Sequence, residues 1–201
     1  MDKIVDLSNE QTYKIVNFIL KNRQFTQKEV IDKSRVSKGW VSKVFRRLES
    51  KGYIKKKNSK YSVQNPVDLI SLFNLFRSME NNLIESFSLK PKSEALMREL
   101  IKRKVVFCTT TALQEYSSYY KDPSINFYSE DRKLLEELRT ESKGLTRVNA
   151  YKPDLCLEID IEKKGKMLLT SKVRTIIDLF CNNQAYTSKE LIEKMFGERI
   201  G

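Results

Sequence analysis

Histidine is absent from all 201 residues of this chain, and its absence excludes several catalytic classes together. A chain without imidazole cannot activate a serine or cysteine nucleophile through histidine, cannot form an H-E-x-x-H zinc site and has no histidine general base. Any enzymatic chemistry would depend on carboxylates, lysines, tyrosines or thiols. We predict that the chain is not an enzyme and has no catalytic residue.

Cysteine is scarce, with Cys108, Cys156 and Cys181 as the only examples. Their number is odd, they lie far apart in the sequence, and no pair has C-x-x-C spacing. The pattern predicts small buried apolar residues rather than a disulfide framework or a zinc site. We therefore expect no metal ion and no cofactor.

Long hydrophobic runs are missing as well. No stretch approaches the roughly 18 apolar residues that a membrane-spanning helix needs, and the start Met1-Asp2-Lys3 has no signal-peptide pattern. The sequence predicts a soluble, cytoplasmic protein without a membrane partner.

Acidic residues are few in the N-terminal third of the chain. Residues 1–65 contain 16 lysine and arginine residues against six acidic ones, an excess of +10 out of the +12 of the whole chain. Basic charge concentrated in one segment favours a polyanionic partner. Double-stranded DNA is the partner we expect, because the charge coincides with a structural motif.

The motif consists of three short helices followed by a hairpin. Capping boxes at Ser8 and Thr26 predict helices over 9–22 and 27–34. A third helix is expected over 38–51. Its apolar side chains repeat at helical spacing and must face the other two helices: Val41, Val44, Phe45 and Leu48.

The opposite face of the third helix points outward, at about 100° per residue. It carries the side chains that we predict to contact DNA: Lys38, Gly39, Trp40, Ser42, Lys43, Arg46 and Arg47. Lysine and arginine can donate to guanine O6 and N7, and serine can pair with several base edges. Gly39 lets the helix start come close to the DNA backbone. For Trp40, packing between helices is favoured over contact with DNA sugar.

Two short strands, 53–54 and 61–63, are predicted after Gly52, with a polar turn over 55–60. Four lysines of this turn complete the predicted DNA contacts: Lys55, Lys56, Lys57 and Lys60. They suit phosphate or minor-groove contact and would steepen the salt dependence of binding. A merely solubilising hairpin is the alternative.

Residues 26–54, TQKEVIDKSRVSKGWVSKVFRRLESKGYI, resemble the winged helix-turn-helix of MarR-like transcription regulators. The resemblance implies a DNA-binding domain over residues 1–65, in which the third helix and the wing lie on the same side and contact one duplex.

A connecting segment over 66–90 is predicted to be helical to about Phe87. Apolar residues recur there at helical spacing: Leu69, Leu72, Phe73, Phe76, Met79, Leu83 and Phe87. Such a stripe must be covered, either by the C-terminal domain of the same chain or by a second copy. A second copy would make the protein a homodimer that binds an inverted repeat.

The remaining residues, 91–201, alternate between strand and helix and predict a small α/β effector or partner-binding domain. Strands are expected near 105–108, 125–128, 145–151 and 154–162, and helices over 111–120, 131–139, 171–182 and 188–197. Arg174 and Asp178 lie four residues apart, which predicts a pair on a helix surface worth about 0.3 kcal/mol. The fold class is therefore α+β, a winged helix-turn-helix followed by a small α/β domain.

Two segments of this domain, VFCTTTAL over 106–113 and LTSKVRTIIDLF over 169–180, resemble the effector domain of AbiEi-type antitoxins of type IV toxin–antitoxin systems. Proteins of that family pair a winged helix with such a domain, repress their own operon and counteract a nucleotidyltransferase toxin. The resemblance implies a repressor and a protein partner for the C-terminal domain.

An enzyme is the competing class. Four carboxylates alternate with apolar residues and would share one face of a strand, as in nucleotidyltransferases that hold magnesium: Asp154, Glu158, Asp160 and Glu162. No Gly-x-x-x-x-Gly-Lys loop accompanies them in the sequence, and the solvent-facing side of an amphipathic strand is favoured. A replication initiator or an architectural DNA-binding protein would use the same winged helix. We predict a sequence-specific transcriptional regulator that represses.

Overall fold

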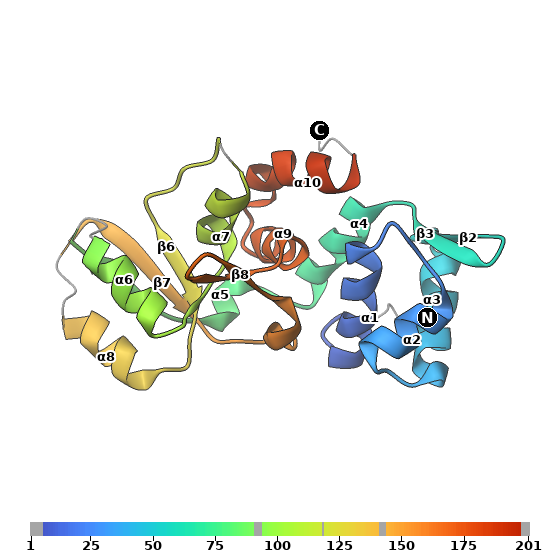
Figure 1. The fold of residues 1–201 in the computed structure, drawn as a ribbon, viewed down its shortest axis with the longest axis horizontal. Coiled ribbons are helices and arrows are strands. Elements are labelled where there is room, and N and C mark those ends of the chain that lie inside the picture. The colour runs from blue at the N-terminus through green and yellow to red at the C-terminus, as the bar shows by residue number, and fades with distance from the viewer. Residues whose placement is uncertain (1–5, 91–93, 118, 141–143, 198–201) are drawn as a thin grey trace. The chain divides into compact units, whose positions relative to one another are not determined.

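The computed structural model describes residues 6–90, 94–117, 119–140 and 144–197, and the chain divides into two compact units (Figure 1). The first unit extends to Arg77 and the second begins at Ser78. Helices and strands occur in both units, so the predicted α+β class is confirmed.

The first unit contains the three predicted helices: α1 (Glu10–Lys21), α2 (Gln27–Ser34) and α3 (Lys38–Ser50). The capping box at the start of α2 is present. Thr26 Oγ1 accepts from the backbone N–H of Glu29 at 3.2 Å, and Glu29 Oε2 accepts from the backbone N–H of Thr26 at 2.7 Å. These bonds satisfy two N–H groups that the helix itself leaves free.

The cap of α1 differs from the prediction. Asn9, not Ser8, caps this helix, because its side chain accepts from the backbone N–H groups of Gln11 (3.0 Å) and Thr12 (3.2 Å). The hydroxyl of Ser8 donates instead to Asp6 Oδ1.

A three-stranded antiparallel sheet with the order β1-β3-β2 completes the first unit. β2 (Ile54–Lys57) and β3 (Lys60–Val63) continue through the lysines that were predicted as a turn, and meet at a two-residue turn, Asn58-Ser59. Asn58 has a φ of 56°, a conformation that tight hairpin turns use. β1 (Gln24–Phe25) was not predicted, because two residues show no periodicity and the strand forms only by pairing with β3.

One core joins these helices to the sheet. The apolar stripe of α3 is buried, as predicted. The ring of Phe45 lies edge-on to Tyr61 of β3 and to Phe25 of β1, with centroids 4.8 Å and 5.9 Å apart. Aromatic packing therefore holds the β2–β3 hairpin against the helix that carries the predicted DNA contacts.

The prediction of one continuous helix after β3 is wrong. The segment forms, in order, α4 (Pro66–Ser71), the 3-10 helix η1 (Leu72–Leu75), α5 (Met79–Asn82) and β4 (Leu83–Leu89). Phe73 packs edge-on against Tyr13 of α1, with centroids 5.8 Å apart, whereas Phe87 lies in the core of the second unit. In β4 Phe87 and Leu89 alternate with exposed serines, so the period there is that of a strand.

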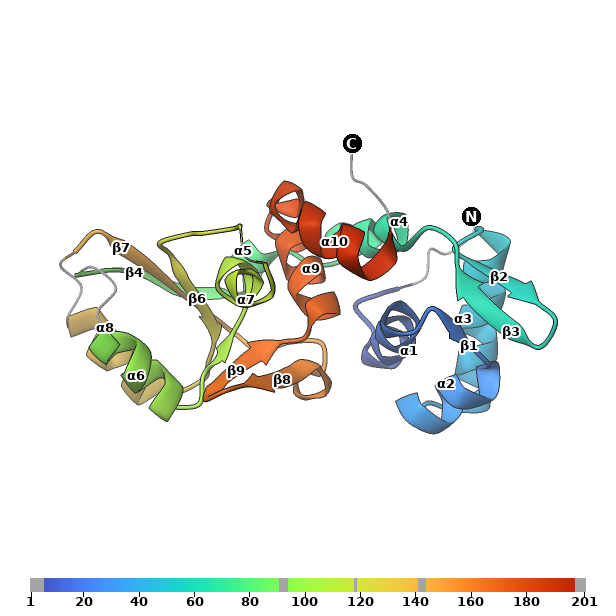
Figure 2. The same ribbon diagram turned by 45° about the horizontal axis from the view of Figure 1, so that its top comes forward.

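The second unit contains a six-stranded mixed sheet with the order β4-β7-β6-β5-β9-β8 (Figure 2). Its other strands are β5 (Val106–Phe107), β6 (Ile125–Tyr128), β7 (Thr146–Tyr151), β8 (Ile161–Lys164) and β9 (Met167–Thr170). β6 runs parallel to β7, and β5 runs parallel to β9; the other neighbours are antiparallel. The predictions near 105–108, 125–128 and 145–151 are confirmed, whereas β9 was not predicted.

The helices of this unit are α6 (Glu94–Lys102), α7 (Thr109–Tyr116), α8 (Arg132–Thr140), α9 (Lys172–Cys181) and α10 (Lys189–Phe196), with the 3-10 helix η3 (Ala185–Ser188) before α10. Of these, α6 was not predicted, and α7 ends four residues earlier than expected. All three cysteines are buried and none of them forms a disulfide, as predicted.

The two faces of the six-stranded sheet differ in chemistry. One face is apolar, and it joins α6 and α8 in a core that includes Phe107, Phe127, Val148, Leu100 and Leu134. These two helices lie side by side (Figures 1 and 2). The alternate residues of β6 and β7, among them Asn126, Tyr128, Asn149 and Tyr151, point to the opposite face.

Residues 154–162 do not form the predicted strand. Leu155 and Cys156 have positive φ values of 47° and 52°, and Leu157–Asp160 is a 3-10 helix, η2. Asp160 is only 1% exposed, and its Oδ1 accepts from Ser171 Oγ at 2.9 Å, so its predicted place on a solvent face is wrong. The predicted row of carboxylates therefore does not exist. In the part of the chain that the structure describes, no three histidine, cysteine or acidic side chains come together to hold a metal ion.

Arg174 and Asp178 form the predicted ion pair, but the prediction that the pair lies on the helix surface is wrong. Both side chains of α9 are fully buried, and Arg174 Nε donates to Asp178 Oδ1 at 2.8 Å. Tyr128 of β6 covers the pair, accepting from Arg174 Nη2 at 3.0 Å and donating to Asp178 Oδ1 at 2.9 Å. Arg174 also pairs with Asp154. The spacing indicates the pair, but only the packing of α9 on the polar face of the sheet shows that it is buried.

Candidate nucleic-acid interface

The start of α3 is formed by a tight turn and a cap. Arg35 ends α2 in the left-handed conformation, with a φ of 56°, which lets the chain reverse within three residues. Ser37 then caps α3, its hydroxyl accepting from the backbone N–H of Trp40 at 3.4 Å. With the apolar stripe of α3 buried, the rest of the helix faces outward.

The outward face is basic and uncovered. Lys38, Gly39, Lys43 and Arg46 are all exposed. Among the residues that the structure describes, none of these three cations takes part in an ion pair. Their charge is therefore available to a partner outside the chain.

Gly39 has no structural explanation within the first unit. A Cβ placed there would meet no described atom within 4 Å, and the residue does not have a positive φ. Neither packing nor backbone conformation requires glycine at this position, although glycine weakens a helix. The absence of a side chain leaves the surface of α3 flat at this point.

The remaining predicted residues of α3 lie at the edges of this face. Trp40 is half-buried and its Nε1 donates to Thr12 of α1 at 3.3 Å, so the predicted packing between helices is confirmed. The ammonium of Lys43 lies 4.8 Å from the centre of the Trp40 ring, which holds the lysine stem against the helix. Arg47 is half-buried.

Ser42 is less open than the sequence predicts. It is half-buried, and its Oγ accepts from Gln27 Nε2 at 2.6 Å, which bridges α2 to α3. Sequence analysis did not identify Gln27 or Thr12 as residues that position the face of α3. Neither carries a local signal, since each bond joins side chains from different helices.

The wing places its lysines on both sides of the hairpin. Lys56 pairs with Tyr61 across the strands, and its ammonium lies 5.7 Å from the centre of that ring. Lys55 and Lys57 point to the other side because side chains alternate along a strand. Lys57 and Lys60 lie opposite each other next to the turn, and all four lysines are exposed.

One carboxylate near the wing is held in its charged form. The backbone N–H and the hydroxyl of Thr26 donate to Glu29 and lower its pKa, and attraction to Lys60 acts in the same direction. Glu29 therefore stays ionised at neutral pH and belongs to the capping box rather than to the basic face.

Comparison with known proteins agrees with this geometry. The model of the winged helix-turn-helix DNA-binding family matches residues 8–55, from the residues before α1 into β2. No curated protein matches the chain. None of the described helices has the length and hydrophobicity to cross a membrane. The first unit is thus a winged helix-turn-helix DNA-binding domain of a regulator.

Proposed function

We propose that this protein is a cytoplasmic transcriptional repressor that binds double-stranded DNA in a sequence-specific way. The observation that carries the proposal is the uncovered face of α3. The exposed Lys38, Lys43 and Arg46 lie on this face together with Gly39, a glycine that neither packing nor backbone conformation requires. In winged helix-turn-helix domains an α-helix enters the major groove, where lysine and arginine can donate to guanine.

The wing supports the same proposal by a different contact. Its four exposed lysines lie on a hairpin that Phe45 and Tyr61 hold against α3. Lysines of this kind bind phosphates without regard to sequence and add affinity that falls with salt. In this proposal α3 recognises the bases, and the wing binds the phosphate backbone of the DNA.

The proposal that the protein represses transcription, rather than activates it, rests on the sequence of the second unit. Its segments 106–113 and 169–180 resemble AbiEi-type antitoxins, which repress their own operons. We propose by the same resemblance that the target is an operon of the type IV toxin–antitoxin kind and that the second unit binds a protein partner.

We further propose that the second unit has no catalytic role. Glu158 and Glu162 are exposed, and Glu162 accepts from the hydroxyl of Tyr116. Asp154 and Asp160 are bonded to Arg174 and Ser171. Replacing Glu158 and Glu162 by glutamine should leave DNA binding and repression unchanged. Magnesium-dependent nucleotide transfer that these changes abolish would contradict the proposal.

Chromatin immunoprecipitation with sequencing, combined with transcript measurement in a strain that lacks the gene, tests the proposed function. A repressor should occupy a few promoters, and the transcripts of those genes should rise when the protein is absent. Arg46→Ala should lose this occupancy, whereas the exposed Arg132→Ala in the second unit should keep it. Occupancy confined to an origin, or spread evenly over the genome, would instead indicate an initiator or an architectural protein.

A further inference from the structure

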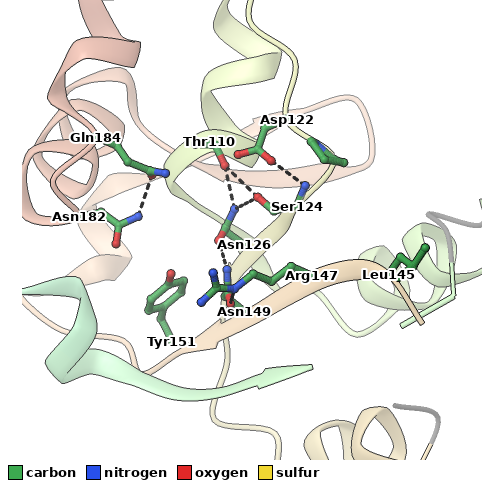
Figure 3. Close-up of a pocket in the computed structure, with 11 residues that line it drawn as sticks. Thr110, Asp122, Ser124, Asn126, Leu145, Arg147, Asn149, Tyr151, Asn182 and Gln184 are labelled. Carbon is green, nitrogen blue, oxygen red and sulfur yellow. Dashed lines mark hydrogen bonds between the residues drawn. The ribbon is translucent and has the colours of Figure 1, made fainter. Parts of the chain in front are cut away.

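The polar face of the six-stranded sheet opens into a cavity of about 440 Å³ (Figure 3). The cavity lies wholly within the second unit. Its floor is formed by buried side chains of β6, β7 and the start of α7: Asn126, Asn149, Tyr151 and Thr110. Its rim includes the loop before β6 with Asp122, the guanidinium of Arg147, and the turn after α9 with Asn182 and Gln184.

The floor is rigid because its amides bond to one another. Asn149 Nδ2 donates to Asn126 Oδ1 at 2.8 Å, and Asn126 Nδ2 donates to Thr110 Oγ1 at 2.8 Å and to Ser124 Oγ at 3.0 Å. A buried network whose members satisfy one another keeps a single arrangement. The floor can therefore hold the rim groups at defined positions before any ligand arrives.

Only one of the three guanidinium nitrogens of Arg147, Nε, forms hydrogen bonds to described residues. Its Nε donates to Asn149 Oδ1 at 3.2 Å and to Ser86 Oγ at 3.3 Å. Its two terminal nitrogens have no hydrogen-bond partner among the described residues. A guanidinium held in this way presents paired donors, which suit the oxygens of a phosphate or carboxylate.

Tyr151 also has bonding capacity that the chain leaves unused. The residue is only 4% exposed, its hydroxyl has no partner in the described part of the chain, and Figure 3 shows it directed into the cavity. Burial raises the pKa of this hydroxyl, so it remains protonated at neutral pH and can donate. The hydroxyl is therefore available to a ligand that enters the cavity.

The other unused groups include both donors and acceptors. Asn182 Nδ2 donates to Gln184 Oε1 at 2.8 Å, which leaves Asn182 Oδ1 to accept and Gln184 Nε2 to donate. The carboxylate of Asp122 can only accept when it is ionised, and its Oδ1 already accepts from the backbone N–H of Ser124 at 2.7 Å. Inorganic phosphate offers mostly acceptor oxygens and few O–H donors at neutral pH, so it would match these acceptors poorly.

We propose that the cavity binds a phosphorylated sugar, either free or as part of a nucleotide. The phosphate would take the terminal nitrogens of Arg147, and the sugar hydroxyls, which both donate and accept, would match the mixed lining. The volume is within the range of small-molecule sites, and the apolar lining consists of Pro123, Leu145 and the ring of Tyr151. A ligand with a polar group on nearly every carbon therefore suits the cavity better than one with an apolar side chain.

Isothermal titration calorimetry on the full chain, at constant ionic strength, tests this assignment. The probes are ribose 5-phosphate, adenosine monophosphate, ribose, inorganic phosphate and serine. At least one phosphorylated sugar should bind about tenfold or more tightly than ribose and than phosphate, because each fragment makes only part of the contacts. Stronger binding of adenosine monophosphate would identify a nucleotide as the source, and stronger binding of ribose 5-phosphate a free sugar phosphate.

Variants locate the binding. Tyr151→Phe and Arg147→Ala should each weaken binding about tenfold, the loss expected for one hydrogen bond to a charged group. Tyr151→Phe should leave the melting temperature unchanged, since its hydroxyl bonds to no described residue. Arg147→Ala also removes the bonds from Nε to Asn149 and Ser86, so its melting temperature is measured beside its binding. Arg132→Ala and the DNA-contact variant Lys43→Ala serve as controls with unchanged binding, so this test does not depend on DNA recognition. Equal binding of the phosphorylated sugars and their fragments, tighter binding of serine, or full binding by both cavity variants would overturn the proposal.

Discussion

At the scale of single residues, a substitution at Gly39 should change stability and DNA binding in opposite directions. Alanine is a better helix former than glycine, and α3 has room for a methyl group at this position. Gly39→Ala should therefore raise the free energy of unfolding by about 0.5–1 kcal/mol and yet weaken operator binding, since the methyl group would lie between helix and DNA. Urea denaturation and DNA titration measure the two effects. Gln11→Ala, at the corresponding position of α1, is the control and should leave operator binding unchanged. If Gly39→Ala bound the operator as tightly as the unchanged protein, α3 would not approach the DNA closely at this residue.

Lys43 and Arg46 are the residues that should distinguish one DNA sequence from another. Replacing either by alanine removes donors to base edges and should cost about 1–3 kcal/mol on the operator but less on random DNA. Fluorescence anisotropy with both duplexes at one salt concentration measures the difference. Arg132→Ala, which removes the same charge from the second unit, should change neither value. Equal losses on both duplexes would mean that α3 does not contact base edges.

Arg174 and Asp178 illustrate how much burial changes the effect of one ion pair. Asp178→Ala removes one of the two carboxylates that pair with the buried Arg174 and leaves only Asp154. It should lower the free energy of unfolding by about 3 kcal/mol, the low end of the range for a broken buried pair. Chemical denaturation with urea measures this loss. Arg139→Ala, which breaks the exposed pair with Glu85, is the control and should have a far smaller effect. A loss from Asp178→Ala as small as that of the control would show that the pair behaves as a surface pair.

At the scale of elements, the wing should add affinity without adding specificity. Lys55→Gln or Lys57→Gln removes one exposed charge from the hairpin without disturbing its pairing. Operator and random DNA should weaken about equally, and the slope of log K against log salt should fall by about one unit per lost phosphate contact. Binding titrations at several salt concentrations give this slope. Loss of specificity with an unchanged slope would instead place the wing lysines on base edges.

At the scale of the whole molecule, a repressor that binds an inverted repeat needs two copies. The burial of Phe73 and Phe87 in the cores of their own units removes one argument for a dimer, because these side chains no longer need a second chain to cover them. The symmetry of such operators still predicts two chains per duplex, with half-sites about one turn apart. Analytical ultracentrifugation of the protein alone and on operator DNA measures the stoichiometry. A monomer at micromolar concentration in both samples would exclude the dimer.

The winged helix-turn-helix could be predicted from the sequence because its determinants are local. The capping box at Thr26, the cap at Ser37 and the four-residue apolar stripe of α3 all act within a few residues, and the wing follows a glycine that ends the helix. The basic face of α3 follows from the same periodicity. The family match over residues 8–55 covers this predictable part of the chain.

Only the tertiary structure decided the features that join distant parts of the chain. β1 exists through its pairing with β3, and the periodicity of residues 66–90 gave no sign that Phe73 and Phe87 belong to different cores. The burial of Arg174 depends on Tyr128, 46 residues away. The cavity gathers side chains from four separated segments, so its composition appears at no single place in the sequence. Periodicity predicts which side of an element is buried, whereas the partner that buries it, and the chemistry between them, depend on how the elements pack.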